Sequence, residues 1–366
     1  MTITMKAAVC REFGTPLEIE TVELAPPGAA EVRVKMVACA ICHSDLMYMD
    51  GSWGGKLPAI YGHEAAGVVE SIGAGITNAA VGDHVVVTLI RACGECHLCQ
   101  SGKPSLCTGS LPLDTSAPLR SPSGEEYVQG LRTAAFAEYV TVHQSQVVVI
   151  DKSVPLDRAS LLACGVITGL GAVTNSANIP AGSHVVVIGT GGVGLNSVQG
   201  AALRDAKTVI ALDTEPGKLE TAMEFGATHG VDVRAGDAAA EIRKITDGHG
   251  ADYVFVTVGS TAAVDQSFAM LASGGALVIV GMPPTGAMST FEPGDIAAAG
   301  QQIIGSKMGS SRPQADIPKL VDLYLAQRLK LDELITNRFP FSDINAAIAS
   351  CRKGTDLRNV VMFDAQ

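Results

Sequence analysis

Four cysteines with chemically suggestive spacing lie close together in the sequence: Cys93, Cys96, Cys99 and Cys107 form the pattern C-x2-C-x2-C-x7-C. Four thiolates at this spacing can close a tetrahedron around one zinc ion, which leaves no coordination position free for chemistry. An iron–sulfur ferredoxin motif would place proline after the fourth cysteine, where this chain has Thr108. Disulfides would need an oxidising compartment and are typical of small secreted domains. The spacing therefore predicts a structural zinc site.

A glycine-rich turn supplies a second kind of chemistry. The residues Gly189, Thr190, Gly191, Gly192, Val193 and Gly194 match G-x-G-x-x-G, with the apolar run HVVVI before them and an apolar stretch after them. In such a turn the first glycine permits a sharp bend, the second lets the backbone approach a pyrophosphate, and the third lets helix and strand pack closely. The helix N-terminus then offers free N–H groups to the phosphates.

Asp213 decides which dinucleotide this turn favours. It ends the next apolar run and follows Gly194 at the distance of about 20 residues that the motif requires. A carboxylate there accepts the ribose hydroxyls and repels a 2′-phosphate, and Thr214 follows it where NADP sites use arginine. The sequence predicts an NAD site. The alternative is a glycine-rich turn in an α/β domain that binds no nucleotide.

Three more potential metal ligands are spread along the chain: Cys42, His63 and Cys164. Two thiolates and one imidazole can hold zinc and leave a fourth position open for substrate. No spacing rule joins ligands so far apart, and free cysteines are commonly buried core residues. Chemistry alone therefore leaves both interpretations open.

The elements that would position these residues change in kind near Pro155. Before it, short alternating runs such as 31–37, 66–72, 83–89 and 146–150 are separated by glycine and proline turns, which predicts an antiparallel β body. After it, apolar runs at 184–189, 208–213, 253–259, 276–281 and 302–307 alternate with helical stretches at 195–204, 216–225 and 238–246. This alternation predicts a doubly wound parallel sheet with helices on both faces. A helix over 316–327 and a strand over 359–363 are expected near the end.

Composition limits the function classes. The 366 residues carry a net charge of −11 without a Lys/Arg-rich run, which argues against nucleic acid or an anionic membrane as partner. The beginning MTITMKAAVC lacks the pattern of a signal peptide, and no apolar stretch is long enough to span a bilayer. We expect a soluble, cytoplasmic protein.

The run GHEAAGVVESIGAGI, at 62–76, resembles the zinc-site signature of the medium-chain zinc-dependent alcohol dehydrogenases. The order of motifs is similar to that family over essentially the whole chain: Cys42, Gly-His-Glu at 62–64, the cysteine quartet, Cys164 and the glycine turn. The resemblance implies a GroES-like catalytic domain (1–164 and 308–366) around a Rossmann domain (165–307). It implies two zinc ions per subunit, one of them held by Cys42, His63 and Cys164.

The resemblance also implies roles for single residues. Asp45 would orient the ring of His63, Glu64 would be a second carboxylate beside the metal, and Ser44 would take the proton from the bound alcohol. Four further positions match residues that contact the cofactor: His43 and Arg358 at the phosphates, Thr168 at the nicotinamide and Lys218 at the adenosine ribose. Each of these four, and Ser44 as well, could equally be a solvated charge or a local hydrogen-bonding group, and Asp45 and Glu64 could be ordinary surface acids.

One position departs from the family pattern. Many members end their proton relay with a histidine where this chain has Met47, which cannot pass a proton. Trp53 aligns with a pocket-lining position, and Leu89 stands where relatives carry a bulky aromatic residue. A smaller side chain at position 89 would widen the inner pocket.

These residues lead to three functional hypotheses. The first is an NAD-dependent zinc alcohol dehydrogenase that acts on a primary aliphatic or aryl alcohol, or on the aldehyde in reverse. The second is an S-(hydroxymethyl)thiol dehydrogenase that detoxifies formaldehyde, which would share every motif. The third is a non-catalytic nucleotide-binding zinc protein, against which the intact open metal set argues. By analogy with the family, we expect a homodimer or homotetramer.

Overall fold

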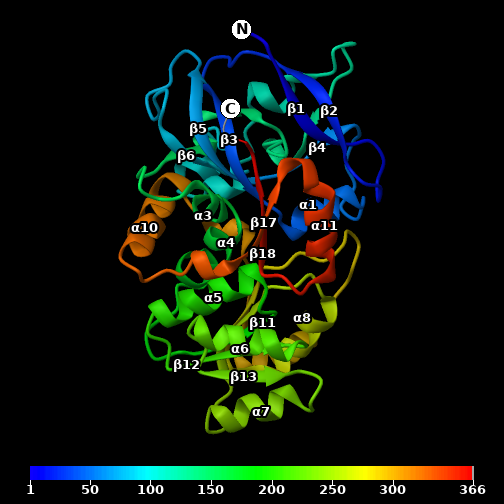
Figure 1. Cartoon of the computed structure of the whole chain (residues 1–366). Coiled ribbons are helices and arrows are strands. Elements are labelled where there is room, and N and C mark those ends of the chain that lie inside the picture. The colour runs from blue at the N-terminus through cyan, green and yellow to red at the C-terminus, as the bar shows by residue number, and fades with distance from the viewer. Residues whose placement is uncertain (365–366) are drawn as a thin grey trace. The chain divides into compact units, whose positions relative to one another are not determined.

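The computed structural model describes residues 1–364 and divides into two units (Figure 1). The first unit is Met1–Cys164 with the segment that begins at Arg312, and the second is Gly165–Ser311. The second boundary follows Ser311 rather than residue 307, where the sequence analysis placed it. The reason is local: Ser311 Oγ donates to the carbonyl of Ile167, 3.1 Å away, which ties 308–311 to the second unit.

The first unit is built on two sheets. One has the strand order β7-β2-β1-β4-β8, and the other has the order β10-β6-β5-β3-β18-β17, with β9 paired to β3. The strands are β1 (Ile3–Cys10), β2 (Glu18–Leu24), β3 (Glu31–Ala40), β4 (Ala59–Ile60), β5 (Glu64–Ile72), β6 (His84–Val87), β7 (Leu119–Arg120), β8 (Val128–Gln129), β9 (Tyr139–His143), β10 (Val147–Val149), β17 (Ile335–Pro340) and β18 (Arg358–Met362).

Most of these pairings are antiparallel, as predicted, although β17 pairs β18 and β4 pairs β8 in parallel. The unit is discontinuous in sequence because β18 is antiparallel to β3, with Val361 opposite Cys39. Figure 1 shows this red strand beside the blue one. A single apolar core, which includes Val34, Val85, Phe136 and Val361, lies under both sheets.

The helices of the first unit are short except for two near its end. They are α1 (His43–Met49), α2 (His97–Gln100), α3 (Leu156–Leu161), α10 (Pro313–Leu325) and α11 (Ile344–Lys353). The predicted helix over 316–327 corresponds to α10, which begins three residues earlier because proline suits a first helical turn.

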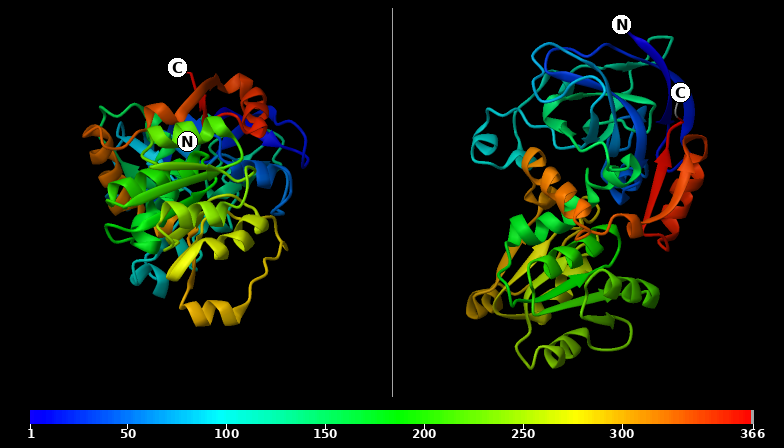
Figure 2. Two further views of the ribbon diagram at one scale, coloured as in Figure 1. Left: turned by 90° about the horizontal axis from the view of Figure 1, so that it is seen from below. Right: turned by 60° about the vertical axis from the view of Figure 1, so that its left-hand side comes forward.

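The second unit is a parallel sheet with the strand order β13-β12-β11-β14-β15-β16 (Figure 2, right). Its strands are β11 (His184–Ile188), β12 (Thr208–Asp213), β13 (His229–Asp232), β14 (Ala251–Val256), β15 (Leu271–Ile279) and β16 (Gln302–Gly305). Its helices are α4 (Gly165–Gly171), the π-helix η5 (Ala172–Ala177), α5 (Gly192–Leu203), α6 (Pro216–Glu224), α7 (Ala238–Ile245), α8 (Thr261–Ser267) and α9 (Pro293–Ala299).

The strand order reverses at β11, which is the switch point of a doubly wound sheet. From β11 the chain moves outward through β12 to β13, then returns to β14, β15 and β16 on the other side. Because parallel crossovers are right-handed, α5 and α6 cover one face and the helices after β13 cover the other. Nucleotides bind at such a switch point, outside the carboxyl ends of the strands.

Candidate functional site

Cys42 is held at the end of β3 by the first turn of α1. It is the N-cap of that helix and has an extended backbone, with φ −104° and ψ 151°. Its N–H donates to Asp45 Oδ2 at 3.0 Å, so the side chain three residues ahead satisfies a backbone donor that the helix leaves unpaired. Asp45 is fully buried, which fixes both residues.

Asp45 also positions His63 through its other oxygen. Oδ1 accepts hydrogen bonds from Gly62 N, at 3.0 Å, and from His63 Nδ1, at 2.9 Å. Because Nδ1 donates, the second ring nitrogen is free to act as a metal ligand. Gly62 has φ +89°, and a Cβ there would lie 2.6 Å from Phe136 N, so only glycine fits before the histidine.

Cys164 reaches the same place from the turn that follows α3. The carbonyl of Ala163, its chain neighbour, accepts a hydrogen bond of 2.7 Å from Thr88 Oγ1 just after β6. Cys42, His63, Glu64 and Cys164 are all buried, and one ligand atom from each lies within 4.8 Å of the others. The structure therefore brings together three residues that no spacing rule connected.

The donor set fits a zinc ion. His63 Nε2 is buried and has no hydrogen-bond partner within residues 1–364, which is costly unless a ligand meets it. A hydrogen bond from the Cys164 thiol lowers the pKa of Cys42, and the same contact raises the pKa of Cys164. Burial lowers the pKa of His63, but the Asp45 and Cys42 charges outweigh it and raise the pKa overall. Two sulfurs and an aimed imidazole nitrogen are a set that zinc binds.

Glu64 lies beside this cluster and is paired with Arg358. The Arg358 guanidinium donates to Glu64 Oε2, and both side chains are buried. Burial raises the pKa of Glu64 to about 8, an effect that Arg358 opposes and the Cys42 charge reinforces. The family resemblance implied a cofactor phosphate as the partner of Arg358 and no protein partner. The structure supplies one, on a residue that is distant in the sequence.

The neighbouring helix α1 carries the other residues expected at this site. His43 is exposed and Ser44 is half-buried in the turn that Cys42 caps. Met47 is also half-buried, and Trp53 packs edge-on against Tyr48 with ring centroids 5.4 Å apart.

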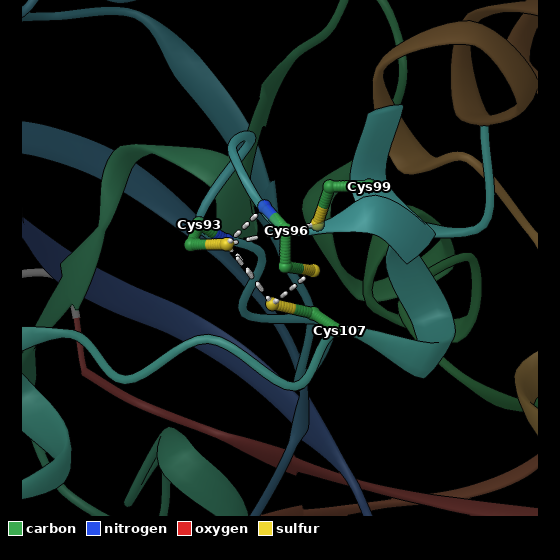
Figure 3. Close-up of side chains that lie close together, drawn as sticks. All are labelled: Cys93, Cys96, Cys99 and Cys107. Atoms are coloured by element: carbon green, nitrogen blue, oxygen red, sulfur yellow. Dashed lines mark hydrogen bonds between the residues drawn. The ribbon is translucent and has the colours of Figure 1, made fainter. Parts of the chain in front are cut away.

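Figure 3 shows the four-cysteine loop, in which the sulfurs of Cys93, Cys96, Cys99 and Cys107 converge. The distances between sulfur atoms are 3.5 Å for Cys93–Cys107, 3.9 Å for Cys96–Cys107 and 4.0 Å for Cys93–Cys99. A tetrahedral zinc site with bonds of about 2.3 Å would separate its sulfurs by about 3.8 Å, whereas a disulfide requires about 2 Å. The observed distances fit the metal site.

Backbone N–H groups support thiolates in this loop. Cys93 Sγ accepts from Cys96 N at 3.3 Å, and Cys107 Sγ accepts from Cys93 N at 3.3 Å. Hydrogen bonds from the backbone of Cys99 and Thr108 lower the pKa of Cys96 to about 5, whereas burial raises the pKa of Cys99 to about 12. Thiolates are the form that binds zinc.

The glycine turn of the second unit has the geometry that a pyrophosphate needs. Gly189 follows β11 with φ +87°, and Gly191 is the N-cap of α5. A Cβ on Gly194 would lie 1.8 Å from Gly189 O, so strand and helix pack too closely for any side chain. A Cβ on Gly191 would meet nothing within 4 Å, so the space above that residue is open to a ligand.

Asp213 lies at the end of β12 as a charged, hydrogen-bonded carboxylate. Oδ2 accepts from Thr190 N at 2.8 Å and from Thr190 Oγ1 at 3.0 Å, and Oδ1 accepts from Thr214 N at 2.7 Å. Burial opposes ionisation, but the Thr190 contacts and the charge of Lys218 keep the pKa of Asp213 below its usual value. The Thr190 hydroxyl was not predicted as a partner of Asp213, although a threonine between the first two glycines of the turn was a signal for it.

Thr168 is buried in α4, and its hydroxyl lies 3.7 Å from Met308 Sδ. Lys218 is half-buried in α6 and is close enough to Asp213 to stabilise the carboxylate.

The Asp45→Asn substitution tests the histidine support. An amide keeps one acceptor but places NH2 against a backbone or ring N–H, so we expect zinc affinity at this cluster to fall by about 10–100-fold. Competition with a chelator measures the change. The control is Asp50→Asn, because Asp50 caps the same helix and pairs with Arg352 on the surface. Equal zinc retention in both variants would contradict the assigned role of Asp45.

Comparison with known proteins bears on the same residues. The family model "Alcohol dehydrogenase GroES-like domain" matches residues 28–152, and the model "Zinc-binding dehydrogenase" matches residues 192–326. An NDMA-dependent alcohol dehydrogenase of Amycolatopsis methanolica is 38% identical over 368 residues, which cover 98% of this chain and 99% of that relative.

Two further relatives carry more specific names. The "Probable S-(hydroxymethyl)glutathione dehydrogenase 1" of Schizosaccharomyces pombe is 38% identical over 371 residues, 98% of this chain and 97% of that protein. The crystal structure of benzyl alcohol dehydrogenase from Acinetobacter calcoaceticus matches with a TM-score of 0.93 at 32% identity, covering 99% of this chain and 100% of the other. Within the described residues, no helix is long and apolar enough to cross a membrane. The chain belongs to the zinc-dependent medium-chain alcohol dehydrogenase family, with a GroES-like domain and a Rossmann domain.

Proposed function

We propose that the protein is an NAD-dependent zinc alcohol dehydrogenase that interconverts a primary aliphatic or aryl alcohol and its aldehyde by hydride transfer. The observation that carries this proposal is the buried set of Cys42, His63 and Cys164, with His63 Nε2 unpartnered. Glu64, the fourth residue of this cluster, is paired with Arg358, which leaves three ligands and one open position. A non-catalytic zinc protein has no use for such an open set, because a structural site is closed by four protein ligands.

Within this proposal Cys42, His63 and Cys164 hold one zinc ion, and Cys93, Cys96, Cys99 and Cys107 hold a second. Zinc at the first site would supply Lewis acidity that makes an alcohol easier to deprotonate. Asp45 keeps the His63 ring in the ligating tautomer through the Nδ1 hydrogen bond. Ser44, beside Cys42 in the first turn of α1, accepts the alcohol proton. Met47 has no group that can pass a proton, so the relay does not continue through that side chain; either water or another group takes the proton onward.

The second unit orients the hydride acceptor. The N-terminus of α5, with Gly189, Gly191, Gly192, Val193 and Gly194, binds the pyrophosphate of NAD. Asp213 binds the adenosine ribose, and Lys218 lies beside it. We place His43 and Arg358 at the phosphates and Thr168 at the nicotinamide as parts of the same proposal. Arg358 can fill this role while it is hydrogen-bonded to Glu64, because a guanidinium has five donors.

An S-(hydroxymethyl)thiol is the second candidate substrate, since a relative at 38% identity is named for that reaction. The panel that separates the candidates contains primary aliphatic alcohols, benzyl alcohol, and formaldehyde mixed with a thiol, each with NAD and monitored by NADH absorbance. A parallel set contains NDMA as acceptor, because one relative is named for that dependence. Zinc content and molar mass are measured on the same sample, with two zinc ions per chain and a dimer or tetramer expected. No turnover of any alcohol, together with one zinc per chain, would refute the proposal.

The Asp213→Gly substitution tests the NAD assignment. Removing the carboxylate deletes hydrogen bonds to the ribose and the repulsion of a 2′-phosphate, each worth more than about 1 kcal/mol. We expect the ratio of kcat/KM for NAD over NADP to fall at least about 10-fold, and a ratio cancels any shared loss of stability. Thr190→Val, which removes one of the two Thr190 donors to Asp213, should give a smaller change in the same direction. An unchanged ratio in Asp213→Gly would rule out this role.

A further inference from the structure

Arg91 is a buried arginine, 3% exposed, whose side chain is held on every side. Its Nε donates to Gln146 Oε1 at 2.8 Å, and its Nη1 donates to Asp114 Oδ1 at 3.1 Å. Its Nη2 donates to Gln129 Oε1 at 2.6 Å and to the carbonyl of Arg132 at 2.7 Å. Burying a guanidinium is costly unless its donors are met, and this network meets four of the five with the fork geometry that only arginine has.

The network fixes the base of the four-cysteine loop. Arg91 precedes Cys93 by two residues, and the intervening Ala92 donates from its N–H to Ser145 Oγ at 2.9 Å. The chain that enters the cysteine quartet is therefore anchored on both the 129–133 and the 143–146 segments.

Arg91 donates to a strained turn at 130–134. Leu131, Arg132 and Ala134 have φ of 50°, 61° and 58°, in the left-handed region that residues with a Cβ avoid. Such conformations persist when the surroundings over-determine them. Here the Arg132 carbonyl accepts from Arg91 and also from Gln146 Nε2, at 3.0 Å.

The other side of this turn holds the residue before His63. Thr133 Oγ1 donates to the carbonyl of Gly62 at 2.8 Å, and Ala135 N donates to the same carbonyl at 2.9 Å. The Gly62 N–H in turn donates to Asp45. Both backbone polar groups of Gly62 are thereby held, the carbonyl by the strained turn and the N–H by the carboxylate that orients His63.

We propose that Arg91 is a positioning residue for His63: it ties the base of the four-cysteine loop to the turn 130–134, and that turn holds the Gly62 backbone. This inference rests on the proposed function, in which His63 binds the catalytic zinc. The metal geometry at Cys42, His63 and Cys164 then depends on an arginine that touches none of these three residues.

The test compares Arg91→Lys and Thr133→Val with the wild type. Lysine keeps the charge but loses the fork, and valine keeps the shape of threonine but loses the hydroxyl donor to Gly62. The matched control is Arg120→Lys, an exposed arginine that pairs with Glu126. Thermal unfolding identifies any variant that fails to fold. If Arg91→Lys does not fold, Asp114→Ala takes its place, because it removes the acceptor of Arg91 Nη1 and leaves the arginine intact.

The readouts are zinc release to a chelator and the visible spectrum after cobalt replaces zinc. Because loss of supporting contacts typically costs about 10–100-fold in metal affinity, we expect one of the two zinc ions to leave at least about 10-fold faster in both variants. The Cys164→Ser protein retains only the four-cysteine site, so its release rate shows which of the two measured rates belongs to that site. The cobalt bands should change in position and intensity, a signature that a purely structural loss in a folded protein does not produce. If the two residues act in one chain of contacts, the double variant should release zinc no faster than the worse single variant.

Two results would overturn the inference. In the first, the wild type holds two zinc ions and both variants match it in release rate and cobalt spectrum. Arg91 then does not position His63, and the proposed function is unaffected. Wild type that holds one zinc per chain would overturn the proposed function and this inference with it.

Discussion

The Cys164→Ser variant is expected to lose turnover by at least about 10³-fold while it stays folded and keeps one of the two zinc ions that the proposed function assigns to the chain. The size follows from the ligand set, because removing a ligand should exceed the roughly 10–100-fold cost of removing a supporting contact. Loss of Cys164 leaves Cys42 and His63, and two protein ligands do not hold zinc at the affinity of three. The remaining ion belongs to the four-cysteine loop. Steady-state kinetics and metal analysis on the same preparation measure both effects.

Cys10→Ser is the matched control for this substitution. Cys10 is also fully buried, but it lies in β1, and its thiol donates to the carbonyl of Glu12, a contact that a serine hydroxyl can keep. We expect two zinc ions and nearly unchanged kcat in this variant. If Cys164→Ser retained wild-type activity, or if Cys10→Ser lost a zinc ion as well, the assignment of the catalytic ligands would fail.

Local pattern was sufficient to predict the parts of the fold where neighbouring residues decide the structure. The strand predicted over 208–213 is β12 with the same bounds, because a continuous apolar run in a parallel sheet is buried on both faces. The helices predicted at 216–225 and 238–246 are confirmed as α6 and α7, each one residue shorter. The convergence of the four cysteines could also be predicted from the sequence, because all four lie within one short segment.

Local pattern failed where distant residues or backbone geometry decide. Helix α4 runs through Gly165, Gly169 and Gly171, which no propensity scale would assign to a helix. It forms because its glycines allow close packing: a Cβ on Gly169 would lie 2.1 Å from Val193 O. Strand β15 begins at Leu271, five residues before the predicted start, because its register shifts against β14.

The same limit applies to the candidate site. Chemistry alone left the assignment of Cys42, His63 and Cys164 as metal ligands open, and the family resemblance was needed to join them, because their proximity depends on β3, β5 and α3 packing together. The Arg358 partner of Glu64 was unpredictable for the same reason, whereas the Thr190 partner of Asp213 had a signal in the threonine of the glycine turn. Arg358 is 294 positions from Glu64, and Thr190 is 23 from Asp213.

Gly191 and Gly194 belong to one motif, and their alanine variants should separate its two physical roles. In Gly194→Ala the new Cβ would lie 1.8 Å from Gly189 O, so the backbone must shift. Because an overpacked site costs about 1–3 kcal/mol or more, the free energy of unfolding should fall by about 3 kcal/mol without any ligand. In Gly191→Ala the Cβ meets no protein atom within 4 Å, and φ is −75°, so stability without ligand should be unchanged.

For NAD affinity, in contrast to stability, Gly191→Ala should have a large effect. The methyl group would occupy the space through which the pyrophosphate approaches the backbone, so NAD affinity should fall at least about 10-fold while the protein remains as stable as wild type. Denaturant unfolding without ligand and NAD titration by calorimetry measure the two quantities separately. A Gly191→Ala protein that binds NAD with wild-type affinity would show that the open space above this turn is not the pyrophosphate site. A generic packing role cannot produce the expected pair of results, because it predicts that both variants lose stability and affinity together.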